Sequence, residues 1–148
     1  MRYRVLIHLL CIAFLAAVFH FIWESLHVGL YTGYSGLSGS LPITVWATIG
    51  DVTYVLASVL FLSLVKYEFQ WMSAPQWADI AGLAILGAGI ALYVEYKALA
   101  LERWSYLPAM PIIPGLEVGL SPVVQMTLLL PLAVVSAAYM IRLLTTRT

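Results

Sequence analysis

Four long apolar stretches divide this chain, and they constrain its fold more than any other feature. They run from about 5 to 30, 43 to 65, 77 to 99 and 122 to 144. Each has the roughly 20 mainly apolar residues that a helix needs to cross a bilayer at a rise of about 1.5 Å per residue. The sequence therefore predicts an all-α protein, an integral membrane four-helix bundle that forms a single domain over 1–148.

Composition supports a bilayer rather than water as the solvent. Of the 148 residues, 63% are hydrophobic and 9% are charged, whereas a soluble domain carries about 25% charged residues. The formal net charge is zero, and no basic stripe is present that would bind nucleic acid. The single cysteine, Cys11, excludes a disulfide within the chain. The first apolar stretch has a basic start but no small-residue cleavage site, so we expect a retained helix rather than a signal peptide.

The distribution of lysine and arginine predicts the orientation. With the amino terminus in the cytoplasm, that side holds five of the seven basic residues, and only Lys97 and Arg103 lie opposite. Cytoplasmic loops are enriched in such residues, so we expect both termini in the cytoplasm. The connections 31–42 and 101–121 then lie on the outer side, and the prolines of 101–121 exclude a continuous helix there.

Three acidic residues lie inside the predicted spans at a similar depth. Glu24 is about 9 Å and Asp51 about 12 Å from the outer end of its helix, and Glu95 is about one turn in. An ionisable group in a bilayer usually faces the bundle interior and serves a function. The alternative is that these groups only hold helices together, at about 0.6 kcal/mol each. Their common depth favours a shared polar pocket in the outer half.

Helical spacing places further residues beside these acids, since residues three and four apart share a helix face. His20, His27 and Tyr31 follow the phase of Glu24, and Tyr54 follows that of Asp51. In the third stretch an alanine stripe leads to Glu95 and predicts a close helix contact. It consists of Ala81, Ala84, Ala88, Ala91 and Ala98.

Acid–base chemistry on a hydrophobic molecule is one use for such a pocket. We expect Glu24 or Asp51 to act as the acid and His27 or Glu95 as the base, with the outer loop 101–121 as a lid. The residues expected to contact the substrate are His20, Tyr31, Tyr54, Trp104, Tyr106 and Gln125.

A metal site is a second use, because Glu24 and His27 have the Glu-x-x-His spacing of di-iron helices. Those sites use two such motifs and this chain has one, so we expect no metal and no cofactor. No serine nucleophile with a base at motif spacing is recognisable.

A third use is non-catalytic, either carriage of a lipid or pigment or a role as a small subunit of a larger membrane complex. Partners would then be a membrane protein or a second copy of the chain. The sequence does not decide whether the chain is an enzyme. Binding of a hydrophobic lipid or isoprenoid, with acid–base conversion of it, is the expectation that accounts for most of the polar residues.

Polar and aromatic residues near the span ends are expected at the membrane surface. Asp79, Glu68 and Glu117 should lie in headgroups or water. Trp71 and Trp77 are typical of an aromatic belt.

Two sets of residues carry a resemblance to known proteins. Phe21-Ile22-Trp23-Glu24 and Glu102-Arg103-Trp104-Ser105-Tyr106, with Gly119-Leu120-Ser121-Pro122, resemble a group of small bacterial multi-pass membrane proteins of unknown function. That resemblance implies the bacterial cytoplasmic membrane and no particular activity. The Trp23-Glu24 pair is also similar to a feature of the membrane-bound terpene cyclases. In those proteins acidic residues start the cyclisation of a prenyl chain.

Overall fold

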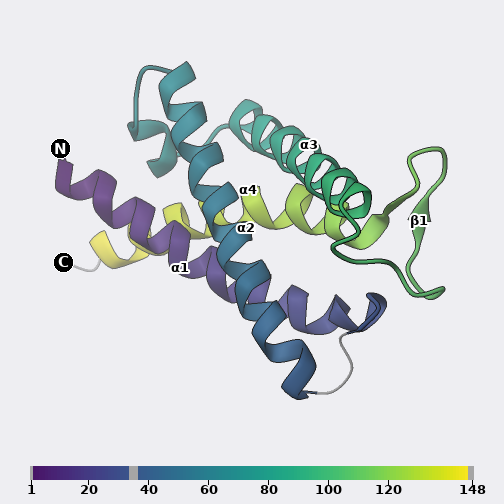
Figure 1. Ribbon diagram of the computed structural model, residues 1–148. Coiled ribbons are helices and arrows are strands. Elements are labelled where there is room, and N and C mark those ends of the chain that lie inside the picture. Colours follow the sequence, from purple (N-terminus) through teal and green to yellow (C-terminus); the bar gives the residue numbers. More distant parts are fainter. Residues whose placement is uncertain (1, 34–36, 147–148) are drawn as a thin grey trace.

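The computed structural model describes residues 2–33 and 37–146, and most of them belong to helices (Figure 1). The long helices are α1 (Arg2–His27), α2 (Leu37–Val65), α3 (Trp77–Ala100) and α4 (Leu120–Thr145). Two short 3-10 helices, η1 (Val28–Leu30) and η2 (Gln70–Ser73), follow α1 and α2. Each long helix includes a segment long and apolar enough to cross a membrane. The predicted all-helical bundle is thus confirmed.

Neighbouring helices pack in the order α2, α1, α4, α3. Helix α1 lies against both α2 and α4, and α3 lies along α4, whereas α2 and α3 touch over a shorter length. Figure 1 shows α2 and α3 diverging from their short connection. A wedge therefore opens between these two helices away from η2.

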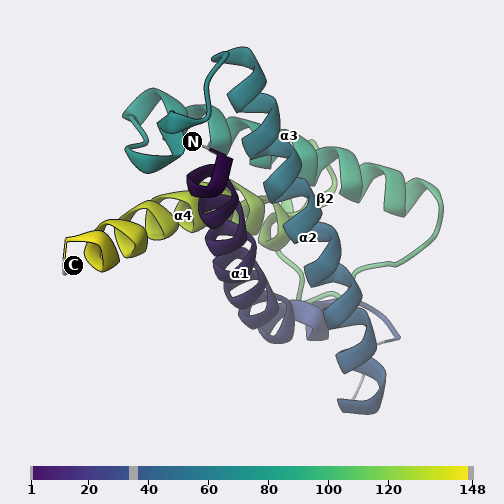
Figure 2. The ribbon, with the colours of Figure 1, turned by 90° about the vertical axis from the view of Figure 1, so that its left-hand side faces the viewer.

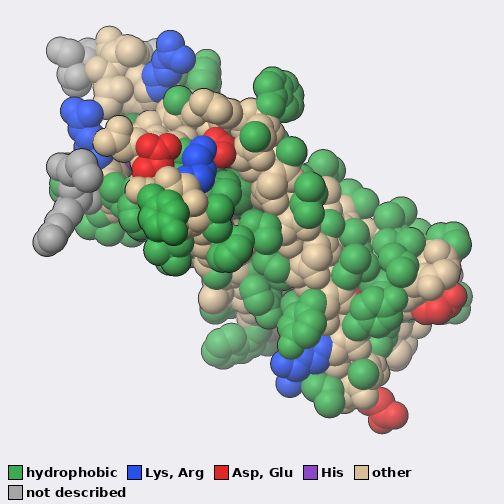
Figure 3. Space-filling view, turned by 90° about the horizontal axis from the view of Figure 1, so that it is seen from above, with side chains coloured by type: hydrophobic (Ala, Val, Ile, Leu, Met, Phe, Trp, Pro, Cys, Tyr) green, Lys and Arg blue, Asp and Glu red, His purple; other side chains and the backbone are tan. Residues whose placement is uncertain are grey.

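Both termini lie at one end of the molecule, as the two ribbon views agree (Figures 1 and 2). An even number of helices returns the chain to the side from which it started. Hydrophobic side chains cover the middle of the face seen in Figure 3, and charged side chains gather towards its two ends. Large apolar residues such as Leu26, Trp46 and Ile85 are more than two-thirds exposed. That distribution is expected where lipid, not water, covers the middle of a helical bundle.

The two predicted outer connections contain more structure than expected. Helix α2 begins at Leu37 and includes Pro42, within the range 31–42 that we expected to be a loop. Proline lacks one backbone N–H, so Pro42, in the second turn of α2, removes a single internal hydrogen bond and the helix continues through it. The connection 101–121 contains an antiparallel hairpin of β1 (Ile112–Ile113) and β2 (Val118–Gly119). Gly115 has a φ of +80° in its turn, a conformation that suits glycine.

The prediction that an alanine stripe of α3 makes the close helix contact was only partly correct. The buried face runs through Leu83, Gly87, Ala91, Glu95 and Ala98, while Ala81 is exposed. The close helix contact is made by Gly87, where a Cβ atom would collide with the backbone of Met126 in α4. Glycine allows this approach because it has no side chain, and such contacts are typical of membrane helices.

Two residues predicted at the membrane surface are buried instead. Asp79 is 4% exposed, and its carboxylate accepts a 2.6 Å bond from Lys66 Nζ and a 2.9 Å bond from the backbone N–H of Gln76. Trp71 belongs to the core and donates to Ser63 Oγ at 2.9 Å. Helix η2 packs against α1 and α4, and this packing buries Trp71. The position of Trp71 in the sequence does not reveal that packing. Trp77, Glu68 and Glu117 are exposed.

Candidate functional site

A cavity of about 410 Å³ lies in the wedge between α2 and α3, closed from behind by α1 and α4. The three acids Glu24, Asp51 and Glu95 all line it, one each from α1, α2 and α3. Most of the remaining wall is apolar. Its apolar residues include Ile43, Trp46, Ala47, Ile90, Val94 and Met126.

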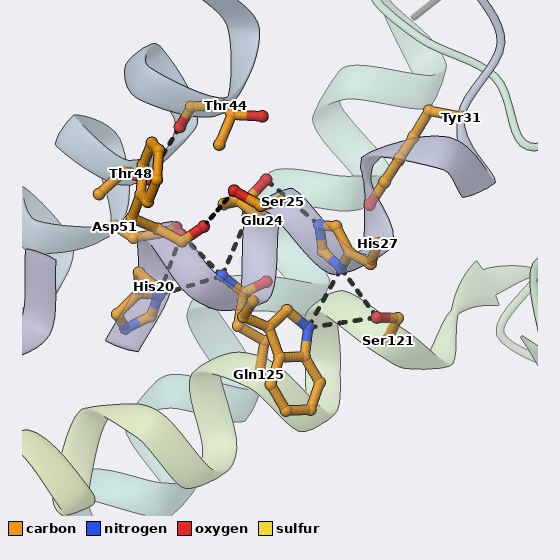
Figure 4. A network of polar contacts seen from close by, with 12 residues as sticks. His20, Glu24, Ser25, His27, Tyr31, Thr44, Thr48, Asp51, Ser121 and Gln125 are labelled. Carbon is orange, nitrogen blue, oxygen red and sulfur yellow. Dashed lines mark hydrogen bonds and ion pairs between the residues drawn. The ribbon is translucent and has the colours of Figure 1, made fainter. Parts of the chain in front are cut away.

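Gln125 of α4 links two of these acids (Figure 4). Its amide nitrogen lies 2.9 Å from Glu24 Oε1 and 2.9 Å from Asp51 Oδ2. The two carboxyl groups also hydrogen-bond to each other. A bond between two carboxyl groups needs a proton on one of them, because an ionised carboxylate only accepts hydrogen bonds.

His20 contacts Asp51 but does not itself line the cavity. This histidine is fully buried, and its Nδ1 lies 3.0 Å from Asp51 Oδ2 and 3.0 Å from the Gln125 amide nitrogen. Nδ1 makes one of these two bonds in each tautomer: it donates to Asp51 when it carries the ring proton, and it accepts from the Gln125 amide when Nε2 carries the proton. His20 Nε2 has no hydrogen-bond partner among the described residues.

A second group of contacts surrounds His27. Its Nε2 lies 3.2 Å from Glu24 Oε2, and its Nδ1 lies 2.8 Å from Ser121 Oγ at the start of α4. Trp23 Nε1–H donates to the same Nδ1 at 3.1 Å and to Ser121 Oγ at 3.3 Å. Glu24 thus joins the His27 group to the Asp51 group through its two oxygens. Figure 4 shows both groups meeting at Glu24.

Three neutral donors surround the carboxyl group of Glu95. Trp104 Nε1–H donates at 3.2 Å, Tyr31 O–H at 3.5 Å, and Tyr106 O–H donates to the same carboxyl group. Tyr106 O also accepts a 3.0 Å bond from the backbone N–H of Gly119. Glu95 therefore fastens the loop that follows α3 to the end of α1.

The two tyrosines that contact Glu95 are held in their neutral form. Burial raises the pKa of the Tyr106 phenol, and its hydrogen bond to Glu95 raises that pKa further. Burial also raises the pKa of Tyr31, and the nearby carboxyl groups of Glu95 and Glu24 add to the effect. A neutral phenol keeps its proton, so both tyrosines act as donors at neutral pH.

Backbone hydrogen bonds also join the segment after α1 to the loop after α3. Thr32 N–H donates to Ser105 O at 2.9 Å, and Leu107 N–H donates to Leu30 O at 2.8 Å. Tyr31 and Tyr106 form a single antiparallel bridge. The first part of the connection 101–121 is thus fixed to the segment after α1.

Most of the predicted site residues reach the cavity itself. Its wall includes eight of the ten, namely Glu24, His27, Tyr31, Asp51, Tyr54, Glu95, Trp104 and Gln125. His20 and Tyr106 lie behind the wall and act through Asp51 and Glu95.

Sequence reasoning missed Trp23 and Ser121. We found no serine paired with a base, yet Ser121 contacts His27 from 94 positions further along the chain. The signal that could have suggested it is a serine at the predicted outer start of the fourth helix, level with His27. Within the described residues, no group of three or more His, Cys, Asp or Glu side chains is arranged to hold a metal ion.

The fold and site define a class of protein: a four-helix bundle of membrane-spanning length with an acid-lined cavity between two of its helices. Comparison with models of protein families, with characterised proteins and with solved structures finds no significant similarity to this chain.

Proposed function

We propose that the cavity binds a hydrophobic lipid or isoprenoid in the membrane and converts it by acid–base chemistry. The observation that carries this proposal is the position of Glu24, Asp51 and Glu95, which line one mainly apolar cavity from three different helices. An apolar wall with a few convergent polar groups is typical of a site for a small hydrophobic ligand.

The opening of the cavity suits a ligand that arrives from the bilayer. Trp46 of α2 is 71% exposed and Tyr54 is 37% exposed, and both also line the cavity. Both belong to α2, which lines the cavity together with α3. A lipid tail could enter the cavity sideways, between α2 and α3, without crossing water.

The proton shared by Glu24 and Asp51 is the acid in this proposal. A carboxylic acid kept neutral in an apolar site can protonate an alkene, an epoxide or a leaving group. His27 is the base in this proposal, because it lines the cavity and its Nδ1, which accepts from Trp23, carries a lone pair. Three donors already occupy Glu95, so we assign it to holding the loop over the cavity.

The proposed setting is a bacterial cytoplasmic membrane, with both termini in the cytoplasm and the cavity in the outer half. The basic residues near the termini and Lys66 support this orientation. The cavity is lined mainly by the second halves of α1 and α3 and the first halves of α2 and α4, away from the start of α1 and the end of α4.

Native mass spectrometry tests the binding step. We expect a lipid to co-purify with the wild-type protein. Ala47→Phe should displace it, since Ala47 lines the cavity, whereas Ala57→Phe on the exposed face of α2 should retain it. Loss of the lipid from neither variant would contradict binding in the cavity. A protein partner at fixed stoichiometry, with no lipid, would instead favour a non-catalytic subunit of a membrane complex.

Amide variants test the conversion step. Glu24→Gln and Asp51→Asn keep shape and hydrogen bonding but remove the titratable proton. If the acids act on the ligand, each variant should retain the unconverted lipid, because acid–base catalysis contributes roughly 10² to 10⁴-fold. The same lipid profile in wild type and both variants would mean that the acids only hold the helices together.

A further inference from the structure

We propose that Ser121 is a nucleophile that accepts an acyl group from an ester lipid, with His27 as its base and Glu24 orienting His27. This inference rests on the proposed function in that the acyl chain would lie in the same cavity. It adds a covalent step that acid–base chemistry alone does not include.

The three side chains form a continuous chain of hydrogen bonds. Ser121 Oγ lies 2.8 Å from His27 Nδ1, and His27 Nε2 lies 3.2 Å from Glu24 Oε2. A hydroxyl becomes a nucleophile when a base accepts its proton and a third group orients the base. Such an arrangement is recognised by geometry and not by sequence position.

Trp23 fixes which ring nitrogen of His27 is the base. Its indole N–H only donates, and it points at Nδ1 from 3.1 Å, so Nδ1 must carry the lone pair. The ring proton is then on Nε2, where it bonds to Glu24. Nδ1 therefore carries the lone pair that would take the proton of Ser121, and the N–H of Trp23 is shared between Nδ1 and Ser121 Oγ.

Ser121 does not itself line the cavity, but its hydrogen-bond partner His27 and its chain neighbour Pro122 both do. Ser121 is the second residue of α4 and half-buried. The positive end of the helix dipole of α4 favours negative charge near this point. An oxyanion that forms as Ser121 attacks a carbonyl would gain from that field.

The proposed reaction balances without any further reagent except water. Ser121 Oγ bonds to the acyl carbon while its proton moves to His27 Nδ1. The ester C–O bond breaks, and the alcohol leaves with the proton from His27. Water, deprotonated by His27, then attacks the acyl carbon, and the carboxylic acid leaves Ser121 with its hydroxyl restored.

A long-chain alkyl fluorophosphonate tests the nucleophile directly. The serine oxygen bonds to phosphorus, fluoride leaves, and the adduct is found by intact mass and peptide mapping. We expect one adduct, on Ser121, in the wild-type protein in lipid nanodiscs. Because this result needs no variant, a folding defect cannot imitate it. No adduct, or an adduct on another serine only, would overturn the proposal.

Variants then separate the roles of the three residues. Ser121→Ala should abolish labelling, and His27→Gln should slow it by about 100-fold or more, since the base supplies this factor. Ser25→Ala is the matched control, because Ser25 bonds only to its own helix, and it should label as wild type does. Labelling of Ser121 at the wild-type rate in His27→Gln would remove His27 from the mechanism.

The two proposals fail in different ways. A wild-type protein that retains a lipid in the cavity but forms no adduct would overturn the role of Ser121 and leave lipid binding in place. An adduct on Ser121 in a protein that retains no lipid would support the nucleophile and contradict the cavity as a lipid site.

Discussion

Gly87 of α3 lies directly against the backbone carbonyl of Met126 in α4. The next residue before Met126 is Gln125, which holds the amide between Glu24 and Asp51. This close contact between α3 and α4 is therefore adjacent to the central donor of the site. Any change that separates α3 from α4 should also move Gln125.

A methyl group at Gly87 should therefore be destabilising. Gly87→Ala forces the two helices apart, and overpacking of this kind costs about 1–3 kcal/mol. Gly89→Ala is the matched control, because the space around Gly89 in the same helix is open. We expect a lower unfolding temperature in detergent for Gly87→Ala only. Equal unfolding temperatures in the two variants would contradict the close contact.

Removing the amide of Gln125 should loosen the acid pair. Gln125→Met keeps the size of the side chain but leaves the acceptors on Glu24 and Asp51 without their shared donor. An unsatisfied buried polar group costs about 1–3 kcal/mol. Thr127→Val, two residues on, removes only a bond to its own helix at Val123 and should cost less. Chemical unfolding of both variants measures the difference, and a larger loss in Thr127→Val would contradict the linking role.

The phenol of Tyr106 should control the loop that covers the cavity. Tyr106→Phe removes the donor to Glu95 and the acceptor for the Gly119 N–H. We expect faster hydrogen exchange at the Gly119 amide, since that amide loses its partner. Tyr93→Phe provides a control on an exposed part of α3. Unchanged exchange at Gly119 in Tyr106→Phe would mean that the hairpin is held by other contacts.

Cysteine labelling tests the orientation in the membrane. In a Cys11→Ala background, Pro114→Cys in the hairpin turn should react with a membrane-impermeant reagent from the outer face only. Ser73→Cys in η2 should react from the cytoplasmic face only. Both positions are exposed, so access depends on the side of the membrane. Labelling of Pro114→Cys from the cytoplasm would reverse the predicted topology.

The sequence by itself determined the four helices and the meeting of the three acids. Helix length and hydropathy are local properties, so the spans followed from the order of the residues. Glu24, Asp51 and Glu95 were expected to point inward because an acid facing lipid is costly. Their common depth then left one place for them to meet.

Only the tertiary structure decided which faces of the helices touch. In lipid, apolar residues surround the whole helix, so hydropathy gives little information about its rotation, and the α3 contact lies at Gly87 rather than along the alanine stripe. Trp71 is buried because η2 packs against α1 and α4, which is also a contact between distant parts of the chain. The contact between Ser121 and His27 joins residues 94 positions apart, and it depends on how α1 and α4 are rotated and aligned against each other. Those relations are set by side-chain packing among all four helices, and no local pattern in the sequence contains them.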